Sequence, residues 1–538
     1  MFKYVFLFCL SSLISAQPLL IKDNLVGPKD GCANLNQVDD LILAYKSKIY
    51  FCGTNRFADF STDGDFEPWV YDPATDLMTI HAQLIPFKGS VPNKFFISGD
   101  KMYFAARDEF NLYDYLYVSD GTKAGTINLS DSIINKLKGM LVNSSRNTIA
   151  SLRNGAIFNA YETNSTFGLW YTDSTRKGTI RLNANGFADN FIVHPKYNVA
   201  LFSQNGKFMI SDGTVAGTKE LNDLLNISSV NSSSVGAGIF GDNFLLEALD
   251  INTGTFGLFV TSGISNQYTK LVEFGGVASK VRNVTDLGNN RCIFSNDKGI
   301  YLTDGTKSGT SQIPGLTSYK LMNAYKDLWT IYKGKVYFAA SDTNTGKGVE
   351  LYVSDGTISG TKMLIDINAT ASSIPSNFNV YKDLLYFTAT TTIHGNELWY
   401  TDGINSARLS DINPGAADSN PMYLTGLDNN LYFSAIQTNS GRELYRFSLA
   451  KVSIDNISSN TRIDVLPTIN NGEFLIKSND NQMISSISVK NENGIEICLI
   501  KEPQSIIDLK NHNVTPGLYF ISFFAGNKLI STKKIIVY

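Results

Sequence analysis

Aspartate–glycine pairs recur along the chain, and their carboxylates could in principle bind cations or sugar hydroxyls at one face of a fold. The pairs are Asp120–Gly121, Asp212–Gly213, Asp304–Gly305, Asp355–Gly356 and Asp402–Gly403. An Asp in this setting also accepts a hydrogen bond from the backbone two residues on, while Gly supplies positive φ. Because the pair repeats in copy after copy, whereas binding sites arise where copies differ, we interpret these residues as structural turns.

Three glutamates form a second repeated set, since Glu350, Glu397 and Glu443 each precede a leucine and an aromatic residue. Glycosidases use paired carboxylates a few ångströms apart, so an acid/base function is one hypothesis. The shared place in the repeat favours the other hypothesis, in which each glutamate has a structural partner such as a buried turn or a cation of a neighbouring unit.

Candidates for metal binding are few. Asp63, Asp65 and Glu67 alternate in STDGDFEP and offer oxygen ligands suited to Ca²⁺, but the EF-hand spacing is absent. We therefore expect a solvated acidic loop and no cofactor, with Ca²⁺ as the less favoured alternative. The four histidines stand outside any HExxH frame and are not expected to be catalytic: His81, His194, His394 and His512.

The DG pairs belong to a longer repeat. Counting weaker copies, the motif position falls at residues 72, 120, 173, 212, 262, 304, 355, 402 and 448, a mean spacing of 47 residues. An apolar run such as KIYFCG, KMYFAA or KVYFAA precedes each copy, and a third run such as KMLIDIN often follows it. Departures occur at Ser174, at Ser262 and after Gly403, where we expect the unit to survive and the turn to be lost.

The repeat predicts an all-β fold. Each unit contains four short strands, and four strands in 40–50 residues are typical of a propeller blade. Aromatic and β-branched side chains on both faces of a strand suit a blade that packs against two neighbours. We predict eight or nine blades. The final copy lacks a fourth strand, and QPLLIKDN after residue 16 resembles the third run, so we expect the N-terminal strand to close the ring.

Bulk properties narrow the class of protein further. The net charge is −3 with interspersed signs, which argues against a nucleic-acid partner. Residues 1–16, MFKYVFLFCLSSLISA, have a lysine, an apolar run of about ten residues and a small-residue end, the pattern of a signal peptide. No later stretch is apolar for long enough to span a membrane. In an oxidising compartment, Cys32 and Cys52 could form a disulfide.

The last part of the chain, 451–538, lacks the DG repeat. It alternates apolar and polar residues between turn signals such as Asn471–Gly472 and Pro516–Gly517, which predicts a small Ig-like β-sandwich. The predicted organisation is therefore a signal peptide (1–16), a β-propeller (17–450) and a β-sandwich (451–538).

Both parts resemble known families. The repeats resemble the ELWxxDGTxxGT repeat of exported bacterial proteins, a family without one settled activity. The tail resembles the type A C-terminal sorting domain of type IX secretion cargo, although Thr468–Ile469 stands where that family has Asn-Pro. The matching positions are Pro467, Asn471, Gly472, Gly494, Pro516, Gly517, Tyr519, Lys533 and Lys534. This resemblance implies export through the periplasm by the type IX machinery, to the cell surface or the medium.

Two functions remain open on the sequence. The favoured hypothesis is a non-enzymatic, secreted or cell-surface binding or adhesion scaffold whose ligand is an unknown glycan or protein. The alternative is an extracellular polysaccharide-active hydrolase or lyase that uses side chains at the mouth of the central channel.

Overall fold

The computed structural model describes two compact units, Leu19–Arg446 and the tail from Phe447, the latter grouped with the N-terminal residues. The described residues are 18–24, 30–32, 41–54, 66–85, 89–107, 114–129, 139–140, 148–161, 167–184, 186–221, 227–228, 237–262, 268–318, 329–448, 463–466, 469–470, 473–478, 484–491, 496–501, 503, 506–509, 517–526 and 528–537. The predicted signal peptide lies outside them.

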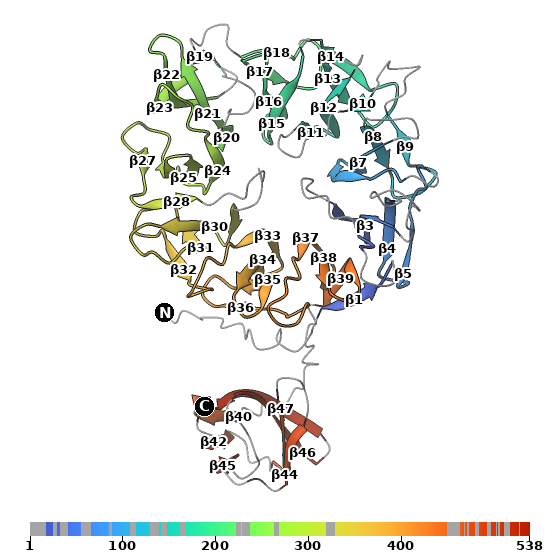
Figure 1. Cartoon of the computed structure of the whole chain (residues 1–538), viewed down its shortest axis with the longest axis vertical. Helices are drawn as coiled ribbons and strands as arrows, with labels where there is room; N and C mark the ends of the chain where they lie inside the picture. Colours follow the sequence, from blue (N-terminus) through green and yellow to red (C-terminus); the bar gives the residue numbers. More distant parts are fainter. Residues whose placement is uncertain are drawn as a thin grey trace. The chain divides into compact units, whose positions relative to one another are not determined.

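The larger unit is a β-propeller, which confirms the predicted fold class. Its described strands form eight antiparallel sheets arranged around a ring (Figure 1). The largest sheet, over residues 93–183, contains two four-stranded repeats joined by a short strand, and we treat these as separate blades, which gives blades 1 to 9 in chain order. Within a blade, successive strands pair with each other, and the first strand lies on the inner side of the ring. Short local hairpins explain this order, because each apolar run is followed by a turn and by the next apolar run.

Blade 1 contains β2 (Ile42–Tyr45), β3 (Lys48–Gly53), β4 (Glu67–Asp72) and β5 (Leu77–Ile80). Blade 2 contains β6 (Asn93–Ser98), β7 (Lys101–Arg107), β8 (Asp114–Ser119) and β9 (Ile127–Asn128). Blade 3 contains β11 (Ile149–Leu152), β12 (Gly155–Tyr161), β13 (Phe167–Thr172) and β14 (Ile180–Asn183), and β10 (Gly139–Met140) pairs with both β8 and β12. Blade 4 contains β15 (Ala188–His194), β16 (Val199–Gln204), β17 (Lys207–Ser211) and β18 (Lys219–Glu220). Blade 5 contains β20 (Ala237–Phe240), β21 (Asn243–Asp250), β22 (Thr255–Thr261) and β23 (Tyr268–Gly275), and β19 (Ile227–Ser228) also pairs with β21. Blade 6 contains β24 (Arg282–Asp286), β25 (Cys292–Asn296), β26 (Gly299–Thr303) and β27 (Ser311–Gln312). Blade 7 contains β29 (Trp329–Tyr332), β30 (Lys335–Asp342), β31 (Val349–Ser354) and β32 (Lys362–Ile365), and β28 (Leu316–Ser318) also pairs with β30. Blade 8 contains β33 (Ser376–Tyr381), β34 (Leu384–Thr391), β35 (Gly395–Thr401) and β36 (Ser406–Arg408). Blade 9 contains β37 (Met422–Leu427), β38 (Asn430–Gln437), β39 (Gly441–Ser448) and the N-terminal strand β1 (Leu19–Lys22).

The core of the propeller consists of apolar layers between neighbouring blades. Between blades 1 and 2, for example, Tyr50 and Cys52 pack with Phe95, Phe104 and Tyr117. Equivalent layers lie at the following junctions, including the one that joins the last blade to the first: 2–3, 3–4, 4–5, 5–6, 6–7, 7–8 and 9–1. Both faces of each middle strand are therefore buried, and a single blade would expose two apolar surfaces to water.

The N-terminal strand closes the ring. β1 pairs antiparallel with β39, with Leu19 opposite Arg446 and Leu20 opposite Tyr445 (Figure 1). The segment after β1 adds a second attachment, because the backbone N–H of Gly31 donates to Glu443 Oε1 at 2.8 Å and to the carbonyl of Arg442 at 3.0 Å. Closure of this type removes two sheet edges that an open array would expose.

The tail unit is a β-sandwich of two sheets. One sheet contains β40 (Ile463–Leu466), β42 (Glu473–Ser478) and β45 (Ile506–Asp508), and the other contains β41 (Ile469–Asn470), β47 (Lys528–Val537), β46 (Gly517–Ala525), β43 (Ser486–Asn491) and β44 (Glu496–Lys501). Side chains from both sheets, among them Ile476, Ile507, Ile487, Val489 and Phe523, form its core.

Candidate functional site

The carboxylates of the DG motifs cap their own turns. In each of the five motifs, one Asp oxygen accepts the backbone N–H two residues on, at 2.8–3.0 Å. In four of them the threonine at that position also donates its hydroxyl to the same oxygen, at 2.6–2.7 Å. The hydrogen bond from Thr122 is the main reason that the pKa of Asp120 lies below its ordinary value, and Thr306 and Thr357 act in the same way on Asp304 and Asp355.

The glycine of the DG pair also makes room for the preceding blade. Gly403 has φ +93°, and a Cβ at this position would lie 2.7 Å from the hydroxyl oxygen of Tyr337 in blade 7. At Gly121 the hydroxyl of Tyr50 in blade 1 donates to the glycine carbonyl at 3.1 Å. The motif is therefore both a turn and a contact between blades.

The expectation that the turn is lost where glycine is replaced is wrong at Ser174. This residue keeps φ +80°, and Thr175 donates its N–H and its hydroxyl to Asp173 Oδ1 at 3.0 and 2.7 Å. The serine hydroxyl is hydrogen-bonded to the hydroxyl of Tyr103 in the preceding blade. A contact from the neighbouring blade therefore supports a backbone conformation that is unfavourable for serine.

The repeated glutamates bind the backbone that leads to the next blade. Glu350 is fully buried and accepts the N–H of Ile367 at 2.9 Å and the N–H of Ser373 at 3.0 Å. Glu397, also fully buried, accepts the N–H of Ile412 at 3.0 Å. Glu443 accepts Gly31 N–H in the same way, so the N-terminal segment takes the place of the linker at the ring closure.

Burial shifts the acidity of two of these groups. It is the largest influence on Glu397, whose pKa rises to about 7, although the N–H of Ile412 partly opposes it. The pKa of Glu350 is raised for the same reason. Neither carboxyl reaches solvent, so neither is placed to transfer a proton to a substrate in this structure.

Sequence reasoning missed an equivalent glutamate, Glu247. In blade 5 the repeat position holds Gly257, and the carboxylate comes instead from the neighbouring strand β21. Glu247 is buried and accepts the N–H of Lys280 at 3.1 Å and that of Val281 at 2.8 Å. The sequence contains a sign of this exchange, because this copy of the repeat lacks a glutamate at the usual position, Gly257, and has Glu247 in the preceding apolar run.

The histidines have dissimilar surroundings. His81 is buried, and burial lowers its pKa to about 4; its Nε2 lies 3.0 Å from Thr126 Oγ1. His194 is buried between Tyr197 and Phe244. His394 is partly exposed, with Nδ1 3.1 Å from Asp411 Oδ2, and His512 lies outside the described residues.

The disulfide that the sequence allows between Cys32 and Cys52 is not formed in this structure, where both residues are buried free thiols. The backbone bridge pairs Cys32 with Gly53, so Cys52 points to the opposite face of the blade. The two thiols accordingly belong to different core layers, Cys32 between blades 9 and 1 and Cys52 between blades 1 and 2. This geometry does not favour the bond.

The acidic segment supplies one described residue. Glu67 is buried and accepts hydrogen bonds from the N–H of Ile85 at 2.9 Å and the hydroxyl of Ser90 at 2.5 Å, whereas Asp63 and Asp65 lie outside the described residues. Within the described ranges, no group of three or more His, Cys, Asp or Glu side chains is arranged to hold a metal ion.

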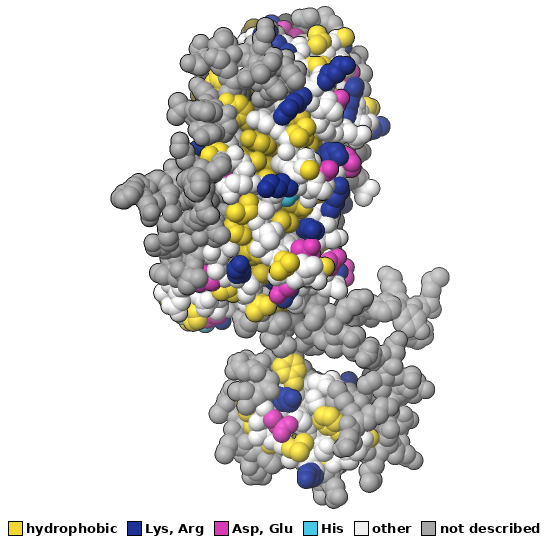
Figure 2. All heavy atoms as spheres, turned by 90° about the vertical axis from the view of Figure 1, so that its right-hand side faces the viewer, with side chains coloured by type: hydrophobic (Ala, Val, Ile, Leu, Met, Phe, Trp, Pro, Cys, Tyr) yellow, Lys and Arg dark blue, Asp and Glu magenta, His cyan; other side chains and the backbone are white. Residues whose placement is uncertain are grey.

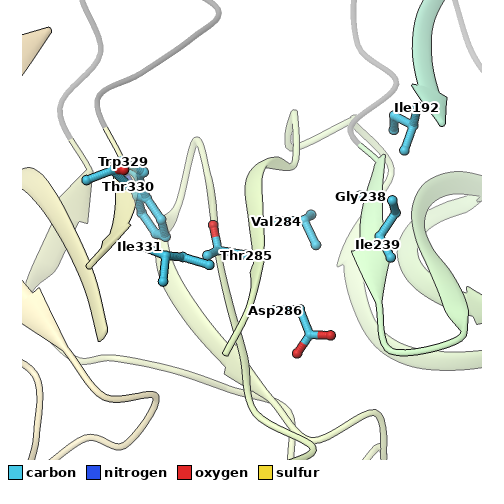
Figure 3. A pocket seen from close by; sticks show the side chains of 9 residues that line it. All are labelled: Ile192, Gly238, Ile239, Val284, Thr285, Asp286, Trp329, Thr330 and Ile331. Atoms are coloured by element: carbon cyan, nitrogen blue, oxygen red, sulfur yellow. The ribbon is translucent and has the colours of Figure 1, made fainter. Parts of the chain in front are cut away.

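A hollow of about 520 Å³ lies where the inner strands depart from the repeat. Its walls come from β15, β20, β24 and β29, the first strands of blades 4 to 7. The lining residues are Ile192, Gly238, Ile239, Val284, Thr285, Asp286, Trp329, Thr330 and Ile331 (Figure 3). This volume falls within the roughly 300–1,000 Å³ of ordinary ligand sites. We call it the inner groove.

Spacing between blades creates the inner groove. β24 packs closely on β20, where a Cβ on Gly238 would lie 2.2 Å from the Cβ of Val284. On the other side, β28 contacts β25 and β26, and side chains of β24 and β29 both line the hollow, with Ile331 and Thr285 close together in the view of Figure 3. Aliphatic side chains dominate the lining, and Asp286 supplies a carboxylate at one end.

The outer surface has no such concentration of one kind of side chain in the view of Figure 2. Lys and Arg side chains are dispersed over the propeller among hydrophobic and acidic ones. Among the described residues, no helix has the length and apolar character needed to cross a membrane.

The described part of the tail places only some of the sorting-motif residues. Gly517 begins β46, Tyr519 is buried in the sandwich core, and Lys533 and Lys534 lie on β47. The remaining motif residues, Pro467, Asn471, Gly472, Gly494 and Pro516, lie outside the described residues.

Comparison with known proteins gives only distant structural matches. No family model and no curated protein matches the chain. Among solved structures, PorZ, a surface component of the type IX secretion system of Porphyromonas gingivalis, is 12% identical with a TM-score of 0.31, over 93% of this chain and 75% of PorZ. The β-propeller domain of the Trilobed protease from Pyrococcus furiosus is 12% identical with a TM-score of 0.33, over 59% of this chain and 97% of that domain. A puromycin hydrolase is 11% identical with a TM-score of 0.35; the match covers 66% of this chain and 59% of the hydrolase.

Proposed function

We propose that this protein is a secreted or cell-surface, non-enzymatic binding scaffold whose ligand contacts the propeller. The observation that carries this proposal is the use of the repeated carboxylates. Asp120 and its equivalents cap turns, and Glu350 and Glu397 bind linker backbone in the buried interior. The repeated acidic groups thus stabilise blades, which leaves the inner groove and the loops to provide specificity.

Export by type IX secretion is the second part of the proposal. It is supported by the signal-peptide pattern of residues 1–16 and by the sorting-domain pattern of residues 451–538. The tail forms a compact unit with a core of its own, as a removable sorting domain requires. In a bacterium with the type IX machinery, truncation after residue 450 should leave the propeller in the periplasm. Secretion of the truncated chain at the normal level would contradict this.

The test of the binding function is a panel of glycans and peptides, assayed both for retention by the protein and for cleavage. The proposal predicts retention without turnover, together with loss of retention when Ile331→Asp places a charge on the apolar lining of the inner groove. Catalytic turnover of any retained compound would overturn it.

A polysaccharide-active hydrolase or lyase is the second candidate, and one cluster favours it. Asp411 Oδ2 lies 3.1 Å from His394 Nδ1 and 3.0 Å from Arg408 Nη1. His394 and Asp411 are both partly exposed. An enzyme that used this cluster would show glycan turnover that His394→Ala and Asp411→Asn abolish.

A further inference from the structure

The inner groove places the edge of an inner strand beside a hollow. β29 pairs with β30 and, among the described strands, with no other; the first strand of each other blade likewise has one partner, so what distinguishes β29 is the hollow beside it. A two-residue turn at Lys333–Gly334 joins these strands, with Tyr332 opposite Lys335. In such a hairpin the closing pair shares hydrogen bonds, so the N–H and C=O of Ile331 point to the other edge, toward the inner groove. An open edge of this kind can accept an added strand.

The side chains beside this edge favour an aliphatic occupant. Ile331 is 45% exposed, and Val284 and Ile239 are partly exposed on the strands that face it (Figure 3). Trp329 is only 8% exposed and stacks on Phe338 with ring centroids 4.8 Å apart. Its ring face is therefore occupied, which removes the aromatic platform that a sugar ring would need and leaves branched aliphatic surface.

The charge at one end of the inner groove selects a basic group. Asp286 accepts the N–H of Gly241 at one carboxylate oxygen and the N–H of Gly288 at the other, both at 2.7 Å. A carboxylate has about four lone-pair sites, so each oxygen retains acceptor capacity for a ligand. A lysine or arginine near the end of an added strand would meet this negative charge.

We propose that the inner groove binds an extended peptide segment of a partner protein, in which aliphatic side chains alternate with polar ones and a lysine or arginine lies near one end. The segment adds as a strand along Thr330–Tyr332, places its aliphatic side chains against Ile331 and Val284, and directs its basic side chain to Asp286. This inference rests on the proposed binding function and names its ligand class.

The test begins with a displayed library of random octapeptides selected on the full-length protein. Selected sequences should alternate aliphatic and polar residues and contain Lys or Arg. A synthetic selected peptide should bind about tenfold more weakly to Ile331→Asp, which places a charge on the contact surface. Val380→Asp is the matched control, because Val380 is 41% exposed at the same position of β33 and lies outside the groove lining.

Two changes in the peptide test the contacts without altering the protein. Methylation of alternate backbone nitrogens should weaken binding about tenfold, since an added strand depends on backbone hydrogen bonds. Replacement of the basic residue by norleucine should weaken binding to the parent protein but not to Asp286→Asn, provided that thermal unfolding shows this variant to be folded.

Three results would overturn the inference: no selected peptides, equal binding to Ile331→Asp, or equal binding of the methylated peptide. If glycans bind in an Ile331-dependent manner while peptides do not, the ligand class is wrong and the binding function stands. Cleavage of a selected peptide would instead overturn the non-enzymatic function.

Discussion

Replacement of Glu397 by glutamine should change how the stability of the propeller depends on pH. In the folded protein burial raises the pKa of this carboxyl from an ordinary value of 4.5 to about 7. The folded state therefore holds the proton more tightly than the unfolded chain. This stabilisation is complete below pH 4.5 and is lost as the pH rises through 7. At about 1.4 kcal/mol per pH unit, the loss amounts to about 3 kcal/mol.

Glutamine resembles the protonated acid, so Glu397→Gln should match the parent at pH 5 and should lose less stability at pH 8. Urea denaturation followed by tryptophan fluorescence at the two pH values measures the difference. Glu273→Gln is a suitable control because Glu273 is exposed and its ion pair with Lys270, 2.9 Å away, lowers its pKa. Its replacement should have a small effect of opposite sign. An unchanged pH dependence in Glu397→Gln would refute the assignment of an uncharged, buried carboxyl.

Three further outcomes follow from the blade contacts. Gly403→Ala should lower the free energy of unfolding by roughly 1–3 kcal/mol, because Gly403 has positive φ and lies close to the Tyr337 hydroxyl. Adding Tyr337→Phe to the same chain should recover part of this loss. Equal losses with and without Tyr337→Phe would contradict the contact. Tyr45→Phe should cost about 1 kcal/mol in denaturant titrations, because the Tyr45 hydroxyl donates to the carbonyl of Asp100 in the next blade at 2.5 Å, and no change would dismiss that hydrogen bond. Chelation by EDTA should leave the unfolding temperature unchanged, since Glu67 is already hydrogen-bonded within the protein; a fall restored by Ca²⁺ would establish the metal site we disfavour.

Much of the fold was accessible from the sequence because propeller blades are local structures. Each apolar run pairs with the next across a short turn, so a repeat of about 47 residues is enough to predict the blades. The closing strand was also predictable, since the N-terminal residues resemble the fourth strand that the last copy lacks. In each case the residues of a single segment are enough to predict its structure.

Other features depend on contacts between segments and were not predictable in this way. Ser174 keeps its turn with the help of Tyr103 from the neighbouring blade. The register that places Cys32 opposite Gly53 decides which face each thiol occupies. The inner groove arises from the spacing of β24 and β29, which no single repeat encodes.

The central claim is that the repeats form a ring closed by the N-terminal strand, and a disulfide engineered across the closure tests it most directly. In a chain without its native cysteines, Leu19→Cys and Arg446→Cys place two thiols at directly paired positions of β1 and β39. Mild oxidation should link them within one molecule, whereas Leu19→Cys with Ile180→Cys, on β14 of blade 3, should remain reduced. Absence of the first link, or its formation only between molecules, would contradict the closed ring.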